Sequence, residues 1–294
     1  MNGPQVALQP DGRRLHLHHG PIDLIVEAFG ETAEIRAAYA QARQRFETIL
    51  TELVEELPDL RGPSAPLPRD FRLPTARRME AVAALFAGEA FVTPMAGVAG
   101  AVADEVLCAM TANRRLERAY VNNGGDIAVH LSPGATLKAA IAGTGRGLGD
   151  HLEIAAADRV RGIATSGRHG RSHSLGIADA VTVLASSAAQ ADIAATLIAN
   201  AVDLPLHPAI HRRPARELSP DSDLGDRLVT IAVDALEPAE IDAALDAGAA
   251  TARHFVTSGR IEAAILYLAG RERVCGRARS ASPDQFRLEE PAYA

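Results

Sequence analysis

Residues 162–203, GIATSGRHGRSHSLGIADAVTVLASSAAQADIAATLIANAVD, form the stretch on which the fold of this chain depends. Hydrophobic patterning predicts a short apolar strand at residues 162–164 and a second strand at residues 178–185. The polar, glycine-rich residues 165–176 between them are predicted to form a loop. A helix is expected next, so the stretch has the order strand, loop, strand, helix.

The predicted helix begins at a recognisable signal, because Ser187 and Gln190 have the spacing of a capping box. Asp192 and Thr196 are four residues apart in this helix and therefore share one face. That face adjoins the apolar stripe that contains Ile193, which places the carboxylate at the edge of the core. A carboxylate there is unfavourable without a partner, so we expect Asp192 to have a ligand.

The composition is that of an ordinary soluble globular protein, with 47% hydrophobic and 23% charged residues in a chain of 294. A formal net charge of −7 argues against nucleic acid or an anionic membrane as a partner. Two cysteines, Cys108 and Cys275, are too few for a disulfide framework and suit a reducing compartment. The uncharged run at residues 90–103 is too short to span a bilayer, so we predict a cytoplasmic protein.

Periodicity and turn residues predict the other elements. Strands are expected at residues 13–20, 22–28, 118–121, 127–131, 138–143, 151–155, 228–233 and 261–268. Helices are expected at residues 31–57, 75–85, 99–112 and 238–256, proline-rich loops at 58–74 and 204–226, and a polar tail at 271–294. Because hairpins alternate with strand–helix units, we expect one α+β domain over residues 1–270, with largely antiparallel sheets and helices packed against them.

Asn122-Asn123-Gly124-Gly125-Asp126 lies between two predicted strands. Asn-Gly-Gly is a strong hairpin signal because both turn residues must accept a positive φ, and a turn is preferred to a binding loop here. The glycine-rich residues 143–150, GTGRGLGD, match no complete phosphate motif and are also interpreted as a hairpin loop. The small residues at 96–103 permit close approach of a neighbouring helix or of a ligand, with helix packing preferred.

An internal duplication is indicated by two segments with the same spacing of alanines, beginning at Val92-Thr93 and at Val181-Thr182. Each segment is expected to enter a helix that carries an acid near its start, Asp104 in one and Asp192 in the other.

Two groups of histidines have spacings found in metal sites. His16 and His18 share a strand face and His19 is adjacent, but a solvated strand face is the preferred interpretation. His207 and His211 are four residues apart, but the neighbouring prolines make a metal-binding helix unfavourable.

Three segments, in this order, resemble the motifs of the ApbE superfamily, the FAD:protein FMN transferases. Asn122-Asn123-Gly124-Gly125-Asp126-Ile127 resembles the family's Asn-x-Gly-Gly-Asp-Ile, and Ala164-Thr165-Ser166-Gly167 resembles its Ala-Thr-Ser-Gly. Ala191-Asp192 with Thr196 resembles its Ala-Asp-x-x-x-Thr. The similarity covers about residues 20–270, and the chain looks most like a shorter, functionally unassigned branch of the superfamily.

The resemblance implies a flavin dinucleotide, FAD, lying across the loops, with Mg²⁺ on its pyrophosphate. The implied metal ligands are Asp192, Thr196 and the backbone carbonyl of Val98 or a neighbour, and these oxygen donors suit a hard cation. His173 matches a loop histidine of the family, and His173 and Asp192 are the candidate catalytic bases. The implied cofactor-binding residues are Asn123, Gly124, Gly125, Asp126, Thr165, Ser166 and Gly167.

The chain departs from the family's pattern in places that concern catalysis. The residues after His173 lack the family's Asp-Pro…Thr-Gly segment, and Ala99 lies near the expected place of a lysine. His19-Gly20-Pro21 stands where family members have a Met-Gly-Thr strand. Two functions follow as hypotheses: Mg²⁺-dependent transfer of FMN to a Thr or Ser of a partner protein, or flavin or nucleotide binding without transfer. A homo-oligomer is left open.

Overall fold

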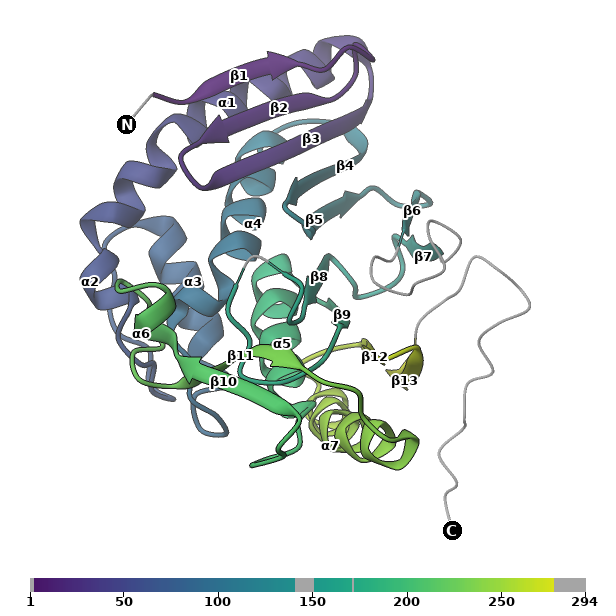
Figure 1. The fold of residues 1–294 in the computed structure, drawn as a ribbon. Helices are drawn as coiled ribbons and strands as arrows, with labels where there is room; N and C mark the ends of the chain where they lie inside the picture. Colours follow the sequence, from purple (N-terminus) through teal and green to yellow (C-terminus); the bar gives the residue numbers. More distant parts are fainter. Residues whose placement is uncertain (1–2, 141–150, 171, 278–294) are drawn as a thin grey trace.

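A nine-stranded sheet forms the centre of the protein, with the strand order β1-β2-β3-β4-β5-β8-β9-β12-β13 (Figure 1). The computed structural model describes residues 3–140, 151–170 and 172–277. Every neighbouring pair of strands in the sheet is antiparallel. Together with its helices, this sheet confirms the predicted α+β class.

The strands of the large sheet are β1 (Gln5–Leu8), β2 (Leu15–His19), β3 (Ile22–Gly30), β4 (Leu116–Asn123), β5 (Asp126–Leu131), β8 (Gly162–Ser166), β9 (Ala180–Ala185), β12 (Ala263–Leu268) and β13 (Arg271–Gly276). Two hairpins, β6 (Thr136–Ala140) with β7 (His151–Ala155) and β10 (Ile210–Pro214) with β11 (Leu228–Val233), form separate sheets. The helices are α1 (Thr32–Glu55), α2 (Leu57–Leu60), α3 (Pro74–Ala84), the 3-10 helix η1 (Pro94–Gly97), α4 (Val98–Thr111), α5 (Ala188–Ala201), α6 (Ala215–Leu218) and α7 (Pro238–Thr257).

Side chains alternate between the two faces of the sheet, and the helices cover one of them. On this helix face, Leu24 and Val26 of β3 share a buried cluster with residues of α1 and α4. Val181 and Val183 of β9 share a second cluster with residues of α5 and α7. The opposite face is covered at β5, β8, β9 and β12 by the β6–β7 hairpin, which contributes Leu152 and other residues to a third cluster.

The order of elements repeats along the chain. A hairpin, β2–β3, is followed by helices that include α1 and α4 and then by the hairpin β4–β5. The same order returns as β8–β9, then α5 and α7, then β12–β13. The two segments aligned in the sequence are not equivalent in this repeat, because Val92 precedes η1 in a loop while Val181 lies within β9.

Several predicted boundaries need correction. The predicted tail begins too early, because Arg271–Gly276 form β13, which pairs with β12. The proline-rich loop at 204–226 contains β10 and α6, and α2 lies at the start of the other proline-rich loop. β1 was not predicted at all. The predicted hairpin loop GTGRGLGD at 143–150 lies outside the described residues.

Helix α4 with η1 forms an 18-residue apolar stretch, Pro94–Thr111, that by length and composition alone could cross a membrane. Of this stretch, 56% is buried within the protein, as in the core helix of a globular fold. Its small residues serve a contact with α5. A Cβ atom placed on Gly100 would lie 2.3 Å from the carbonyl oxygen of Ala188, so the two helices meet there through a glycine.

We predict that Gly100→Ala lowers the free energy of unfolding by about 1–3 kcal/mol, because the added methyl group must push α4 and α5 apart. Urea unfolding followed by circular dichroism measures this change. Gly88→Ala is the matched control, since its Cβ would meet Pro66 at an ordinary 3.8 Å. Equal stability of the two variants would contradict the close helix contact.

Candidate functional site

The β4–β5 turn places two polar side chains on the helix face of the sheet. Gly124 has φ 65° and Gly125 has φ 116°, which confirms the predicted positive φ at both turn residues. The turn sets Asn123 opposite Asp126, on the face that also carries Val121 and Ala128. Asn122 points to the other face and accepts a hydrogen bond from the Gly125 amide at 2.8 Å.

Helices α4 and α5 cap each other. Asp192 of α5 accepts hydrogen bonds from the backbone amides of Gly100, at 2.9 Å, and Ala99 in the first turn of α4. Asp104 of α4 accepts from the amides of Ala188 and Ala189 in the first turn of α5, at 3.0 and 2.9 Å. These amides have no partner within their own helix. Each aspartate therefore provides the hydrogen-bond acceptor for the unpaired amides at the start of the other helix.

The start of α4 thus gives Asp192 a protein partner, and the expected ligand of Asp192 stays a prediction. The predicted cap of α5 is confirmed in one half: Ser187 Oγ accepts from the Gln190 amide at 3.2 Å. The reciprocal half is not formed, since the Gln190 side chain bonds Ser186 Oγ and the Arg260 carbonyl.

The β4–β5 turn is attached to the start of α4, close to Asp192. Asn123 Nδ2 donates to the carbonyl oxygen of Ala99 at 3.1 Å. The Thr165 amide at the end of β8 donates to the Asp126 carboxylate. Three segments that are distant in sequence therefore bring Asp126 and Asp192 into electrostatic contact, and we call these two residues the acidic pair.

Burial raises the pKa of both members of the acidic pair, and the charge of Asp126 raises that of Asp192 further. The pKa of Asp126 rises from 3.8 to about 7, chiefly because burial penalises its charged form. The pKa of Asp192 rises well above its usual value through burial and, next, through the charge of Asp126. Within the described part of the chain, neither carboxylate takes part in an ion pair with a basic residue.

The acidic pair fits a divalent cation chemically, because a bound cation would remove the repulsion between the two carboxylates. Thr196 lies one turn after Asp192 on the same face of α5, and both residues are partly exposed. Val98 is the first residue of α4, so its carbonyl is directed into the hydrogen-bond ladder of the helix. The neighbouring carbonyl of Ala99 accepts from Asn123.

Thr165 of the Ala-Thr-Ser-Gly segment contacts the acidic pair through its backbone amide and not through its hydroxyl. The Thr165 hydroxyl bonds that of Thr182 at 2.9 Å, on the sheet face away from the helices. Ser166 follows Thr165 at the end of β8, and its side chain is partly exposed. A Cβ on Gly167 would lie 2.4 Å from the carbonyl oxygen of Asp179, so close backbone packing requires this glycine.

The loop after β8 is tied to neighbouring segments. Arg168 pairs with Asp179 at 2.8 Å, and the Ala269 amide donates to the same carboxylate at 2.7 Å. His173 Nε2 lies 3.0 Å from Ser219 Oγ, at the end of α6. The described contacts thus join His173 to the α6 region, and its role as a base stays a prediction.

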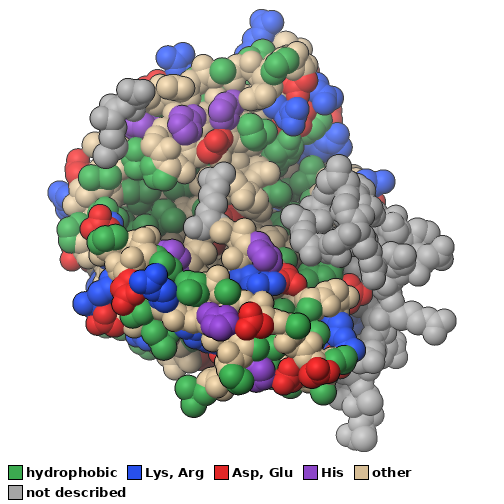
Figure 2. Space-filling model, viewed as in Figure 1, with side chains coloured by type: hydrophobic (Ala, Val, Ile, Leu, Met, Phe, Trp, Pro, Cys, Tyr) green, Lys and Arg blue, Asp and Glu red, His purple; other side chains and the backbone are tan. Residues whose placement is uncertain are grey.

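The sequence did not predict that the segment after α6 packs against residues 91–93, because the prolines of residues 204–226 indicated irregular structure. The Thr93 hydroxyl bonds the Asp223 carboxylate, and the Arg227 guanidinium lies 3.4 Å from the centre of the Phe91 ring. These contacts attach the segment between α6 and β11 to the residues just before η1. Figure 2 shows this face of the molecule hollowed between β2–β3 and the β10–β11 hairpin, with α4 and α5 behind the hollow in Figure 1.

The histidines pair with acids instead of gathering around a metal site. His16 Nε2 lies 2.7 Å from Asp23 Oδ1, and His19 is buried against Phe46, so a solvated face is wrong for His19. His207 and His211 pair with Glu240 and Asp234, at 2.9 and 2.8 Å. In the described part of the chain, no three His, Cys, Asp or Glu residues are grouped as metal ligands.

Comparison with known proteins gives one family and several relatives. Residues 6–274 match the model of a family described as "AbpE bacteria". UPF0280 proteins of Methanothrix thermoacetophila, Methanopyrus kandleri and Methanocaldococcus jannaschii are each 39% identical, over 137, 114 and 120 residues. These matches cover 46%, 37% and 39% of this chain and 55%, 43% and 47% of the relatives, so the chain spans about half the length of the relatives that it matches.

We predict that metal-free protein loses stability as the pH rises from about 4 to about 7. In this range the unfolded chain releases the Asp126 proton while the folded protein keeps it, because the folded pKa is raised from 3.8 to about 7. The contribution of Asp126 to this loss is at most about 4 kcal/mol. Urea unfolding at several pH values in EDTA measures it.

Asp126→Asn removes one of the titrating groups and should make this pH dependence less steep, while the raised pKa of Asp192 still contributes. Asp158→Asn is the control, because it makes the same substitution at a carboxylate outside the acidic pair, one that accepts a hydrogen bond from the Ala155 amide at 2.8 Å. If the stability of the Asp126 variant depends on pH as strongly as that of the wild type, another group is responsible for the pH dependence.

Proposed function

We propose that this chain, which belongs to the AbpE bacteria family, binds a flavin nucleotide through a magnesium ion held at the acidic pair. The observation that carries the proposal is the pair itself, two carboxylates with raised pKa values and no basic partner among the described residues. Their motifs occur in the order found in the ApbE superfamily, which the family's description also suggests.

Asp192 and Thr196 are the residues proposed to hold the ion, with Asp126 beside them. A carboxylate has about four lone-pair sites, so Asp192 can keep its two amide bonds to α4 and still coordinate a cation. When bound, Mg²⁺ would neutralise the pyrophosphate charge and leave its other positions to phosphate oxygens and water. Asn123 and the Thr165 amide keep the turn and Asp126 in place.

Binding without transfer is the function that this site supports better. In FMN transfer, an acceptor hydroxyl attacks the phosphorus of the FMN half, the pyrophosphate bond breaks, and AMP leaves. Arg168 is neutralised by Asp179, His173 is bonded to Ser219, and Ala99 supplies no charge near the acidic pair. The lack of free charged groups therefore weakens stabilisation of the transition state more than it weakens binding of the nucleotide.

We predict that Asp192→Asn weakens Mg²⁺-dependent FAD binding by about tenfold or more, which corresponds to about 1.4 kcal/mol. Calorimetric titration of FAD with and without Mg²⁺ gives the affinities. Asp104→Asn is the matched control, because Asp104 has the same capping geometry at the other helix but is not a proposed ligand.

Both variants should lose similar stability, since each loses one amide–carboxylate interaction. Equal FAD binding by the two variants would mean that Asp192 is a helix cap and nothing more, and the proposed metal site would be wrong.

We predict no detectable FMN transfer when the protein is incubated with FAD, Mg²⁺ and a threonine-containing peptide. Chromatography for AMP and mass spectrometry for a flavinylated peptide provide the measurement. Steady release of AMP together with a modified peptide would favour the transferase hypothesis and would show that the residues absent here are dispensable.

A further inference from the structure

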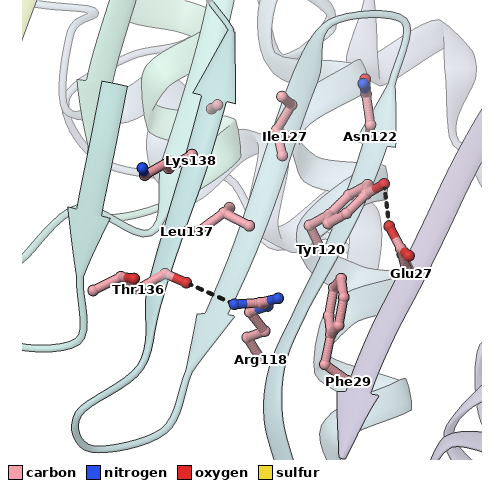
Figure 3. A pocket seen from close by; sticks show the side chains of 10 residues that line it. Glu27, Phe29, Arg118, Tyr120, Asn122, Ile127, Thr136, Leu137 and Lys138 are labelled. Carbon is pink, nitrogen blue, oxygen red and sulfur yellow. Dashed lines mark hydrogen bonds between the residues drawn. The ribbon is translucent and has the colours of Figure 1, made fainter. Parts of the chain in front are cut away.

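A second cavity, of about 590 Å³, lies on the face of the sheet away from the helices (Figure 3). Its lining comes from β3, β4 and β5 on one side and from residues 136–139 of β6 on the other. Asn122 and Ile127 line this cavity, while their neighbours Asn123 and Asp126 point to the helix face. The sheet therefore separates the cavity from the acidic pair.

A buried carboxylate with an unused oxygen lies in this cavity. The Glu27 side chain is 8% exposed, and its Oε2 accepts a hydrogen bond from the Tyr120 hydroxyl at 2.9 Å. Among the described residues, its Oε1 accepts no hydrogen bond. The Nε of the largely exposed Arg13 forms an ion pair with this oxygen at 3.6 Å, which is beyond hydrogen-bond distance. An unmade hydrogen bond on a buried carboxylate is unfavourable, and an N–H group of a ligand would supply it.

Two basic side chains line the same cavity. Arg118 lies 4.1 Å over the Phe29 ring and donates to the Thr136 carbonyl at 3.3 Å. Its buried Nε has no hydrogen-bond partner among the described residues. Lys138 lines the opposite wall and is exposed. Within the described residues neither forms an ion pair with an acid, so the cavity carries one negative and two positive charges.

Apolar side chains line the cavity between these charged groups. Figure 3 shows the Tyr120 ring and Ile127 on one side and Leu137 on the other. Asn122 uses its Oδ1 for the Gly125 amide, which leaves its Nδ2 as a donor. A planar ring can lie along the Tyr120 ring with its edge at Glu27 and an acidic substituent near Arg118 and Lys138.

We propose that this cavity binds a planar heterocycle with adjacent ring N–H and amino donors and an acidic substituent. The 2-amino-4-oxopyrimidine ring, shared by guanine nucleotides and pterins, has this donor edge and can pair with a carboxylate such as Glu27. Adenine presents a ring nitrogen acceptor beside its amino group, so its lone pair would face the carboxylate and binding would be weaker.

Calorimetric titrations of the full chain in EDTA, with GMP, pterin-6-carboxylate and AMP, test the proposal. We expect GMP or pterin-6-carboxylate to bind at least about tenfold more tightly than AMP, because a buried polar group discriminates strongly against a mispaired edge. Tighter binding of one of the two identifies the source of the ring. Binding of neither, or equal binding of AMP, would overturn the proposal.

Glu27→Gln should lower the affinity for the preferred probe by about tenfold, since the carboxamide has one acceptor oxygen where the carboxylate has two. Glu117→Gln makes the same change at an exposed position of β4 outside the cavity and should bind normally. Arg118→Met is a second variant, which keeps an apolar side chain over Phe29. It should also lower the affinity for the probe. Unchanged binding in the Glu27 and Arg118 variants would overturn the site.

The test also distinguishes this cavity from the proposed flavin site. Glu27→Gln should retain Mg²⁺-dependent FAD binding, and FAD with Mg²⁺ should not displace the probe from wild-type protein. Displacement by FAD would show that the cavity is part of the flavin site and would contradict a separate ligand.

Discussion

The reciprocal capping of α4 and α5 fixes the centre of this protein. The side chains of Asp104 and Asp192 each accept hydrogen bonds from backbone amides in the first turn of the other helix. An N-cap is worth about 1 kcal/mol, and a carboxylate also interacts favourably with the helix dipole. For both caps to form, the helices must lie antiparallel with their first turns side by side. The glycine at position 100 permits this, because its backbone contacts Ala188 directly.

The two aspartates have the same structural role but different surroundings. Burial raises the pKa of both carboxyl groups. Asp192 has in addition the carboxylate of Asp126 as its main electrostatic neighbour, whereas Asp104 has the opposing charge of Arg78. A helix cap becomes a candidate cation site when a second carboxylate is placed beside it. The β4–β5 turn provides that carboxylate, and Asn123 holds the turn against α4.

Local signals in the sequence predicted local structure well. The two glycines of the β4–β5 turn, the Ser187 cap and the periodic helices all depend on residues within a few positions of one another. The reciprocal caps join residues 84 to 93 positions apart, and no local pattern indicates them. β13 was missed because its arginines suggested a tail, yet Arg273 pairs with Asp242 and Asp246 of α7, which explains how a charged edge strand is held.

The alternation of side chains along one hairpin relates the two candidate sites. Asn123 and Asp126 face the helices, and Asn122 and Ile127 face the opposite cavity, although they are adjacent in sequence. Because the side-chain period of a strand is two, a shift of one residue in the β4–β5 register would exchange the two sets and destroy both sites. The positive φ of Gly124 and Gly125 sets that register, and the Asn122–Gly125 hydrogen bond stabilises the turn. The glycine motif thus acts through geometry, by fixing which face of the sheet each polar side chain occupies.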